Sequence, residues 1–217
     1  MELNRYIDHT LLKATATDAA IVQLCSEAKE YGFYAVCINA CYLPLAKKEL
    51  KDSGVKIATV IDFPLGASNT ESKVKEARIA IENGADEIDM VINIGFLKSG
   101  WHGAVSKEIS EVKSAIGPRI LKVILEVCYL TDEELITASR IVANSGADFV
   151  KTSTGFGSGG ATEHAVGLMK ETVGDSVQIK ASGGIRTAVS AKKYIALGVS
   201  RIGTSSGVEI VSTNSEK

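Results

Sequence analysis

The sequence has no excess of charge of either sign. Its 217 residues contain 24 Lys and Arg against 26 Asp and Glu, which gives a formal net charge of -2. Binding to nucleic acid or to an anionic membrane surface favours a clearly basic chain. Long apolar runs are also missing, because no segment approaches the roughly 18 residues of a membrane-spanning helix. We therefore expect neither nucleic acid nor a membrane among the partners.

Patterns that hold metals and nucleotides are missing as well. The 3 histidines and 4 cysteines are scattered and lack the paired spacing of zinc sites. No glycine-rich dinucleotide fingerprint follows the first expected strand. The N-terminal segment lacks a basic region followed by an apolar run, so we expect no signal peptide and a cytoplasmic protein with reduced thiols. From these residues we expect no metal site.

What the chain does contain is a regular alternation of two textures. Short β-branched runs are separated by longer stretches rich in Ala, Glu and Lys. Apolar residues at helical spacing predict helices over 18–31, 69–83 and 131–145. The β-branched runs predict strands. These strands are expected at 6–10, 33–38, 55–61, 87–93, 120–127, 148–153, 177–182 and 201–205.

The alternation predicts a parallel sheet. Glycines recur where a helix should end and a strand begin, at Gly32, Gly84, Gly146 and Gly198, and glycine accepts the left-handed backbone that helix ends use. Eight strand–helix units in this length fit a (β/α)8 TIM barrel. We expect one domain over 1–217, with 212–217 as a loose tail. An open doubly wound sheet is the alternative.

Polar residues in the expected strands point to a site. Strand alternation places Asp89 and Asn93 on the face opposite Ile88 and Met90, and so toward the barrel interior or its mouth. Lys151 and Lys180 each precede a glycine-rich loop. Both therefore lie at the carboxyl ends of neighbouring strands, where TIM barrels build their active sites.

Two buried ammonium groups side by side predict a reactive amine. Burial and like charge both lower the pKa of a lysine. A neutral lysine attacks carbonyl carbon and forms a Schiff base. We expect one of Lys151 and Lys180 to be the nucleophile, the other to depress its pKa, and Asp89 to transfer protons.

Other polar residues of the strands have simpler interpretations. Lys122 fits one half of a structural ion pair, with Glu126 as a partner four residues along the same face. Asp8 and Thr10, on either side of His9, are expected to face the mouth of the site.

Two loops predict a phosphate site. "SGGIRT" and "GTSSGVEI" follow the last two expected strands, where TIM barrels commonly bind phosphate. Their small residues expose backbone N–H groups, and each precedes an expected helix start that favours an anion. Gly183, Gly184, Ser205 and Ser206 are the expected donors. Arg186 fits either an additional phosphate ligand or a surface residue.

Four segments together carry a resemblance to a known family. "EIDMVINIGFLKSG", "FVKTSTGFGSGGAT", "IKASGGIRT" and "RIGTSSG" resemble deoxyribose-phosphate aldolase, and the likeness runs over almost the whole chain. It implies a class I aldolase on a TIM barrel that reversibly cleaves 2-deoxy-D-ribose 5-phosphate into D-glyceraldehyde 3-phosphate and acetaldehyde. By motif match Lys151 is the Schiff-base lysine, Lys180 the second lysine and Asp89 the proton-transfer acid.

The resemblance also implies binding residues and partners. The positions that match those holding the sugar hydroxyl or the phosphate are Thr154, Gly155, Gly183, Gly184, Ser205 and Ser206. No metal or organic cofactor is implied, since the intermediate is a covalent lysine imine. The family is usually cytosolic and often dimeric, which makes a homodimer possible. This chain departs from some members at Phe156, where they have a lysine, and in a C-terminal tail without tyrosine.

Two other functions stay open at this level. One is a cofactor-independent phosphosugar isomerase or epimerase barrel, which would need carboxylates or histidines across the site. The other is a non-catalytic barrel that binds a phosphorylated ligand. A metal-dependent aldolase is disfavoured by the scattered histidines and acids.

Overall fold

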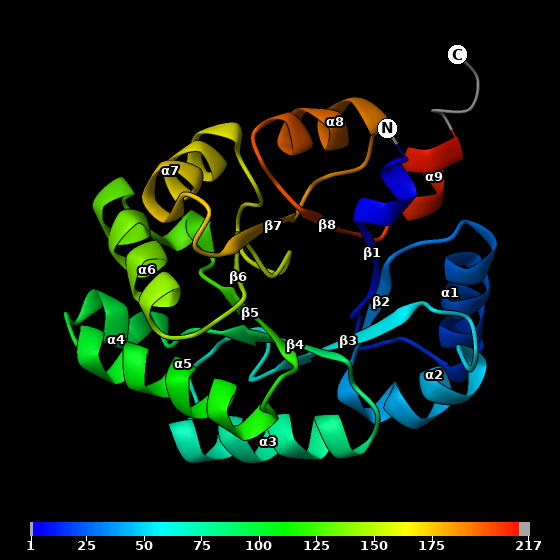
Figure 1. The fold of residues 1–217 in the computed structure, drawn as a ribbon, viewed down its shortest axis with the longest axis horizontal. Helices are drawn as coiled ribbons and strands as arrows, with labels where there is room; N and C mark the ends of the chain where they lie inside the picture. Colours follow the sequence, from blue (N-terminus) through cyan, green and yellow to red (C-terminus); the bar gives the residue numbers. More distant parts are fainter. Residues whose placement is uncertain (1, 213–217) are drawn as a thin grey trace.

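A closed barrel of parallel strands forms the centre of the molecule (Figure 1). It is seen in a computed structural model that describes residues 2–212. The strands are β1 (Ile7–Leu11), β2 (Ala35–Ile38), β3 (Lys56–Ile61), β4 (Glu87–Val91), β5 (Ile120–Ile124), β6 (Phe149–Lys151), β7 (Gln178–Ser182) and β8 (Arg201–Thr204). They pair in chain order, and β8 closes on β1 with Ile202 opposite Ile7. The predicted (β/α)8 barrel is confirmed, and closure excludes the open sheet.

Helices surround the barrel on the outside (Figure 1). The α-helices are α1 (Asp18–Glu30), α2 (Leu43–Glu49), α3 (Thr70–Glu82), α4 (Ile94–Lys98), α5 (His102–Ile116), α6 (Asp132–Asn144), α7 (Glu163–Val173), α8 (Ala188–Ala196) and α9 (Gly207–Ser212). The 3-10 helices are η1 (Leu3–Tyr6), η2 (Ala40–Tyr42) and η3 (Val127–Tyr129). Helix α9 packs against η1, so the two ends of the described chain lie side by side. None of the helices within residues 2–212 has both the length and the apolar composition needed to cross a membrane.

The predicted helix starts are capped as their sequences indicate. The side chains of Thr17, Asn69 and Thr131 accept hydrogen bonds from backbone N–H groups in the first turns of α1, α3 and α6. Thr131 and Glu134 form a reciprocal capping box. At the other ends, the glycines that precede β2, β4, β6 and β8 have positive φ, which ends each helix and turns the chain into the barrel.

Alternation along the strands divides the apolar side chains between two cores. In β4, Ile88 and Met90 belong to the large core between sheet and helices. Val60 of β3 lies opposite Asp89 in the register and belongs to a much smaller cluster with Leu12, Cys37 and Ala58. The interior of the barrel therefore holds few apolar groups, and polar side chains fill the rest of it.

The predicted ion pair between Lys122 and Glu126 is wrong. Strand β5 ends at Ile124, and Glu126 adopts the left-handed conformation with φ 56°. This turn takes Glu126 off the strand face, so the four-residue spacing no longer aligns it with Lys122. Lys122 instead pairs with Glu87 at 2.6 Å and with Asp89 at 2.7 Å.

Residue Ser212, the first of the predicted loose tail, is the last residue of α9. The rest of that predicted tail, 213–217, lies outside the described residues.

Helix α3 buries an ammonium group that its sequence pattern did not reveal. Lys73 is fully buried. Its Nζ donates to Glu108 Oε1 at 2.8 Å and to the carbonyl oxygens of Gly66 and Val91, both at 2.9 Å. A second carboxylate, that of Asp62, lies 3.2 Å from Nζ. Lys73 therefore ties the β3–α3 loop to the end of β4 and to α5.

We expect Lys73→Ala to lower the free energy of unfolding by about 3–5 kcal/mol, because Glu108 would stay buried without its cation. Urea unfolding followed by circular dichroism measures this value. Lys107→Ala is the matched control, since Lys107 is 75% exposed and lies 3.6 Å from Glu111, and its loss should change the value by less than about 1 kcal/mol. Equal effects of the two variants would contradict the account.

Candidate active site

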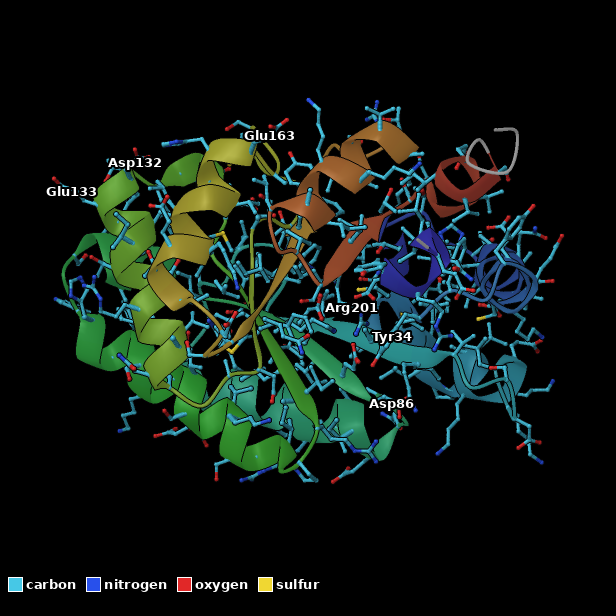
Figure 2. All side chains as sticks on the ribbon, turned by 45° about the horizontal axis from the view of Figure 1, so that its top comes forward. Tyr34, Asp86, Asp132, Glu133, Glu163 and Arg201 are labelled. Atoms are coloured by element: carbon cyan, nitrogen blue, oxygen red, sulfur yellow. The ribbon has the colours of Figure 1, made fainter. Side chains whose placement is uncertain are left out.

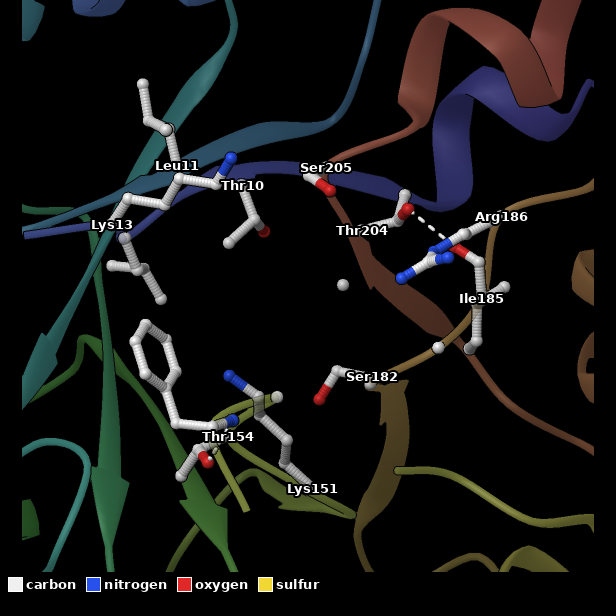
Figure 3. Close-up of a pocket in the computed structure, with 16 residues that line it drawn as sticks. Thr10, Leu11, Lys13, Lys151, Thr154, Ser182, Ile185, Arg186, Thr204 and Ser205 are labelled. Carbon is white, nitrogen blue, oxygen red and sulfur yellow. Dashed lines mark hydrogen bonds between the residues drawn. The ribbon is translucent and has the colours of Figure 1, made fainter. Parts of the chain in front are cut away.

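A pocket of about 390 Å³ opens at the carboxyl ends of the strands (Figure 3). Its lining comes mostly from the loops after β1, β6, β7 and β8. Lys151 points into it from the side across from Thr10 and Ser205, and Lys13 and Arg186 lie on two other, opposite sides (Figure 3). Among the described residues that line it, these three are basic and none is a carboxylate or a histidine. The pocket is therefore suited to an anionic ligand.

Below the pocket, the barrel interior holds a cluster of buried charges. Seven described residues contribute, each at most 3% exposed: Asp8, Glu87, Asp89, Lys122, Lys151, Lys180 and Arg201. They come from β1, β4, β5, β6, β7 and β8. The parallel register brings them together, with Asp89 opposite Lys122 and Lys151 opposite Lys180.

Asp89 is the centre of this cluster. Its Oδ1 accepts a hydrogen bond from Lys122 Nζ at 2.7 Å. Its Oδ2 accepts from Lys151 Nζ at 2.7 Å and from Lys180 Nζ at 2.8 Å. Burial disfavours a charge on this carboxyl, but the three ammonium groups outweigh burial and hold the pKa of Asp89 well below its usual range. Asp89 is therefore a permanent carboxylate shared by three lysines.

A second layer lies deeper in the barrel. Asp8 accepts from Lys180 Nζ at 2.5 Å and from Arg201 Nε at 2.6 Å. Glu87 pairs with Arg201 at 2.9 Å and with Lys122 at 2.6 Å. The Arg201 guanidinium stacks 3.6 Å from the centroid of the Tyr34 ring (Figure 2), a cation–π contact that covers it.

The three lysines differ in how many carboxylates they contact. Lys122 and Lys180 each contact two within 2.8 Å, whereas Lys151 contacts Asp89 alone. For Lys180, burial opposes the charge, but Asp8 and Asp89 outweigh it and raise the pKa. The pKa of Lys122 is raised in the same way, with Asp89 and Glu87 outweighing burial.

The pKa of Lys151 shifts in the opposite direction. Burial lowers it most, the charge of Lys180 lowers it further, and the single carboxylate of Asp89 does not make up the difference. Lys151 is thus the lysine of the cluster that most readily gives up its proton. It is also the one that lines the pocket. This arrangement can present a neutral amine to a carbonyl compound.

Charge counting gives the same result. The cluster contains four cations and three carboxylates among its seven members. With every group ionised it carries one positive charge in excess, in a region where uncompensated charge is costly. A neutral Lys151 removes the excess.

The structure brings most of the predicted binding residues to this pocket. Thr154, Gly155, Gly183, Gly184 and Ser205 line it together with Lys151. Gly183 and Gly184 have φ 91° and 83°, a conformation that favours glycine. The roles predicted for these binding residues, and for Lys151, Asp89 and Lys180, stay predictions.

Ser206 does not belong to the lining. Its N–H donates to Thr204 Oγ1 at 2.9 Å, and its carbonyl accepts from Ile210 N at 3.1 Å. It therefore starts helix α9. Thr10 lines the pocket as expected, but Asp8 lies in the deeper layer and does not line it.

Two charged residues of the cluster were not predicted. Arg201 and Glu87 begin their strands, and a charge at a strand start is normally read as exposed. The signal was strand alternation and register, since Glu87 lies two residues before Asp89 on β4 and Arg201 lies opposite Lys180. Within the part of the chain that is described, no three His, Cys, Asp or Glu side chains are placed to hold a metal ion.

Comparisons with known proteins point to one family. Residues 3–213 match the family model of the DeoC/LacD family aldolases. The deoxyribose-phosphate aldolase of Thermoanaerobacter pseudethanolicus is 56% identical over 213 residues, covering 97% of this chain and 96% of that protein. That of Mycoplasmopsis pulmonis is 56% identical over 211 residues, with the same coverage of 97% and 96%.

Solved structures agree with the sequence relatives. The tetrameric deoxyribose phosphate aldolase of Aeropyrum pernix superposes with a TM-score of 0.90 at 34% identity, covering 99% of this chain and 91% of that one. The aldolase QR15 gives 0.95 at 39% identity, covering 99% and 96%. A charged barrel interior that presents Lys151 to the pocket, and a match over nearly the whole length, lead to one conclusion: this chain belongs to the DeoC/LacD aldolase family.

Proposed function

We propose that this protein is a class I deoxyribose-phosphate aldolase, which reversibly cleaves 2-deoxy-D-ribose 5-phosphate into D-glyceraldehyde 3-phosphate and acetaldehyde. The observation that carries the proposal is Lys151, a pocket-lining lysine whose pKa is lowered by burial and by Lys180. The relatives at 56% identity carry the same activity in their names.

The first step joins Lys151 to the substrate. The neutral amine adds to the aldehyde carbon C1 and forms a carbinolamine, which takes up a proton and loses water to give an iminium ion. Asp89 lies 2.7 Å from the Lys151 Nζ and 2.8 Å from the Lys180 Nζ. Because its own pKa is so low, Asp89 stores no proton. It passes protons between the Lys180 ammonium and the reacting atoms.

The second step breaks the bond between C2 and C3. The C3 hydroxyl gives its proton to the Asp89–Lys180 pair, its oxygen becomes the carbonyl of D-glyceraldehyde 3-phosphate, and the bonding electrons move through C2 to the iminium nitrogen. The product on Lys151 is a neutral enamine. The positive charge of the iminium thus passes to the Asp89–Lys180 pair, and the net charge of the cluster does not change during cleavage.

The last step releases acetaldehyde. The proton taken from the C3 hydroxyl returns to C2 of the enamine, and water hydrolyses the resulting iminium to acetaldehyde and free Lys151. One water leaves in the first step and one enters here, so the overall reaction is a cleavage without net consumption of water. No oxidant, reductant or metal enters these steps, and we propose that the enzyme acts without a cofactor.

The substrate phosphate is proposed to bind opposite Lys151. Gly183, Gly184 and Ser205 border this side of the pocket and offer backbone N–H groups and one hydroxyl. Arg186 lines the same side (Figure 3), where a guanidinium can pair with phosphate oxygens. Phe156, which stands where some family members have a lysine, is 54% exposed and packs edge-on against Phe63 at 5.2 Å.

Three further properties are proposed with the function. The chain is one domain over its 217 residues, the assembly is a homodimer, and the location is cytoplasmic. The isomerase alternative is not favoured, because the described pocket lining contains no carboxylate or histidine to act as its acid and base.

Reductive trapping tests the covalent step. We expect incubation with deoxyribose 5-phosphate or acetaldehyde, followed by sodium borohydride, to leave a reduced adduct on Lys151, located by mass spectrometry of peptides. Lys151→Met should lose the adduct and lower kcat by at least about a thousandfold, since the nucleophile is gone. The exposed Lys107→Met serves as the control and should keep both. An adduct on Lys180 would exchange the two assigned roles, and no adduct on any lysine would exclude the imine mechanism.

The charge balance predicts opposite shifts of the pH profile in two variants. Turnover needs neutral Lys151, so kcat/KM rises as the pH passes the pKa of its amine. Lys180→Met removes a neighbouring positive charge, should raise that pKa, and should move the rising limb to higher pH. Glu87→Gln removes a negative charge from the cluster and should move the limb to lower pH. Shifts in the same direction, or none in either variant, would refute the charge-balance account.

A further inference from the structure

A further buried carboxylate, that of Glu126, lies beside the pocket and takes no part in the charged cluster. Glu126 is 2% exposed and adopts the left-handed conformation with φ 56°. Its side chain accepts from Thr154 and from the thiol of Cys128 at 3.9 Å. No lysine or arginine of the described residues forms an ion pair with it. A buried acid without a cation is unusual, and its hydrogen bonds therefore indicate its role.

Those hydrogen bonds go mainly to one pocket residue. The Thr154 N–H lies 3.3 Å from both carboxylate oxygens of Glu126. The Thr154 hydroxyl forms a short hydrogen bond with Glu126 Oε2. Backbone N–H and thiol S–H groups also point at the carboxylate, so the carboxylate is arranged as an acceptor and the hydroxyl of Thr154 is its donor.

The Thr154 hydroxyl is consequently restricted in what it can offer the pocket. A hydroxyl has one donor and two acceptor positions. The donor is directed to Glu126, and one acceptor position takes the Phe156 N–H at 3.0 Å. One acceptor position is left, on a residue that lines the pocket beside Lys151.

A hydrogen-bond acceptor in the pocket favours a ligand group that can donate a hydrogen bond. A phosphate dianion offers only acceptor oxygens. The Thr154 hydroxyl directs its proton to Glu126, so it has no donor for the phosphate and the phosphate has no donor for it. A substrate hydroxyl can donate to Thr154. The deoxyribose phosphate chain has two such groups, and the C3 hydroxyl loses its proton in the reaction. The C4 hydroxyl, which is the 2-hydroxyl of the acceptor aldehyde in the synthetic direction, takes no part in bond making.

We infer that Glu126 is a positioning residue that fixes Thr154 as a hydrogen-bond acceptor for the C4 hydroxyl, and so sets a preference for acceptor aldehydes with a 2-hydroxyl group. The inference rests on the proposed aldolase function and adds a specificity determinant to it.

Packing around Glu126 keeps this arrangement fixed. A Cβ on Gly157 would lie 2.9 Å from Cys128 Sγ and 3.1 Å from Glu126 Cδ, so the loop after β6 lies directly against the η3 turn. On its other side, the same loop bonds through Ala161 N to the carbonyl oxygens of Ser182 and Gly183, both at 3.1 Å. Thr154 is thus held between two neighbouring loops and has little freedom to turn its hydroxyl.

The test compares two aldehydes that differ only in the group of interest. Acetaldehyde is the donor, D-lactaldehyde and propanal are the acceptors, and the readout is the ratio of their kcat/KM values. We expect the wild-type protein to favour D-lactaldehyde roughly tenfold, the worth of about one hydrogen bond. Thr154→Val removes the acceptor and should bring the ratio close to one. Thr154→Ser keeps the hydroxyl and should keep the preference.

Glu126→Met tests the carboxylate itself. Its thioether has no oxygen to accept from the Thr154 hydroxyl, which is then free to donate elsewhere, so the ratio should fall as in Thr154→Val. A ratio near one in the wild type, or an unchanged ratio in Glu126→Met while Thr154→Val loses it, overturns the inference. Wild-type protein that condenses neither aldehyde overturns the proposed function and the inference together.

Discussion

The sharing of Asp89 among three lysines is the interaction on which the rest of the site depends. Its two oxygens accept from Lys122, Lys151 and Lys180 within 2.8 Å, deep in the barrel. Burying so many charges is tolerated because they compensate one another closely, and removing one partner from such a group leaves a costly residual charge. One carboxylate is too few for three ammonium groups, and Asp8 and Glu87 make up the difference for Lys180 and Lys122 only. Lys151 is left as the group whose proton is least well held.

The barrel fold fixes the positions of these charged side chains. Backbone hydrogen bonds between short parallel strands fix the register of the barrel. The register in turn fixes the height of each charged side chain in the interior, without help from the loops. The two ends of the barrel then carry separate tasks. Arg201 and Tyr34 close the deep layer, while glycine-rich loops at the carboxyl end form the pocket. Glu126 connects the barrel to the pocket, because its carboxylate binds Thr154 in the loop that follows the reactive lysine.

Strand alternation and position in the barrel were sufficient to predict the fold and the group of Lys151, Lys180 and Asp89. What failed depended on single backbone conformations. The left-handed turn at Glu126 broke the expected pairing with Lys122, and the start of α9 drew Ser206 away from the pocket. The burial of Lys73 was not predicted, because helical spacing identifies buried positions by their apolar residues. Nothing in the local sequence shows that Glu108, 35 positions later, forms an ion pair with it. Long-range partners of this kind follow from the closed barrel and cannot be read from one segment.

Direct titration of the lysines tests the central claim most directly. In protein carrying lysine labelled with carbon-13 at Cε, the resonance of Lys151, assigned with Lys151→Arg, is followed by NMR as the pH is raised. The account predicts that Lys151 loses its proton below the ordinary lysine pKa of 10.5, while Lys122 and Lys180 stay protonated over the same range. A Lys151 that titrates at or above that value, or after Lys180, would contradict it.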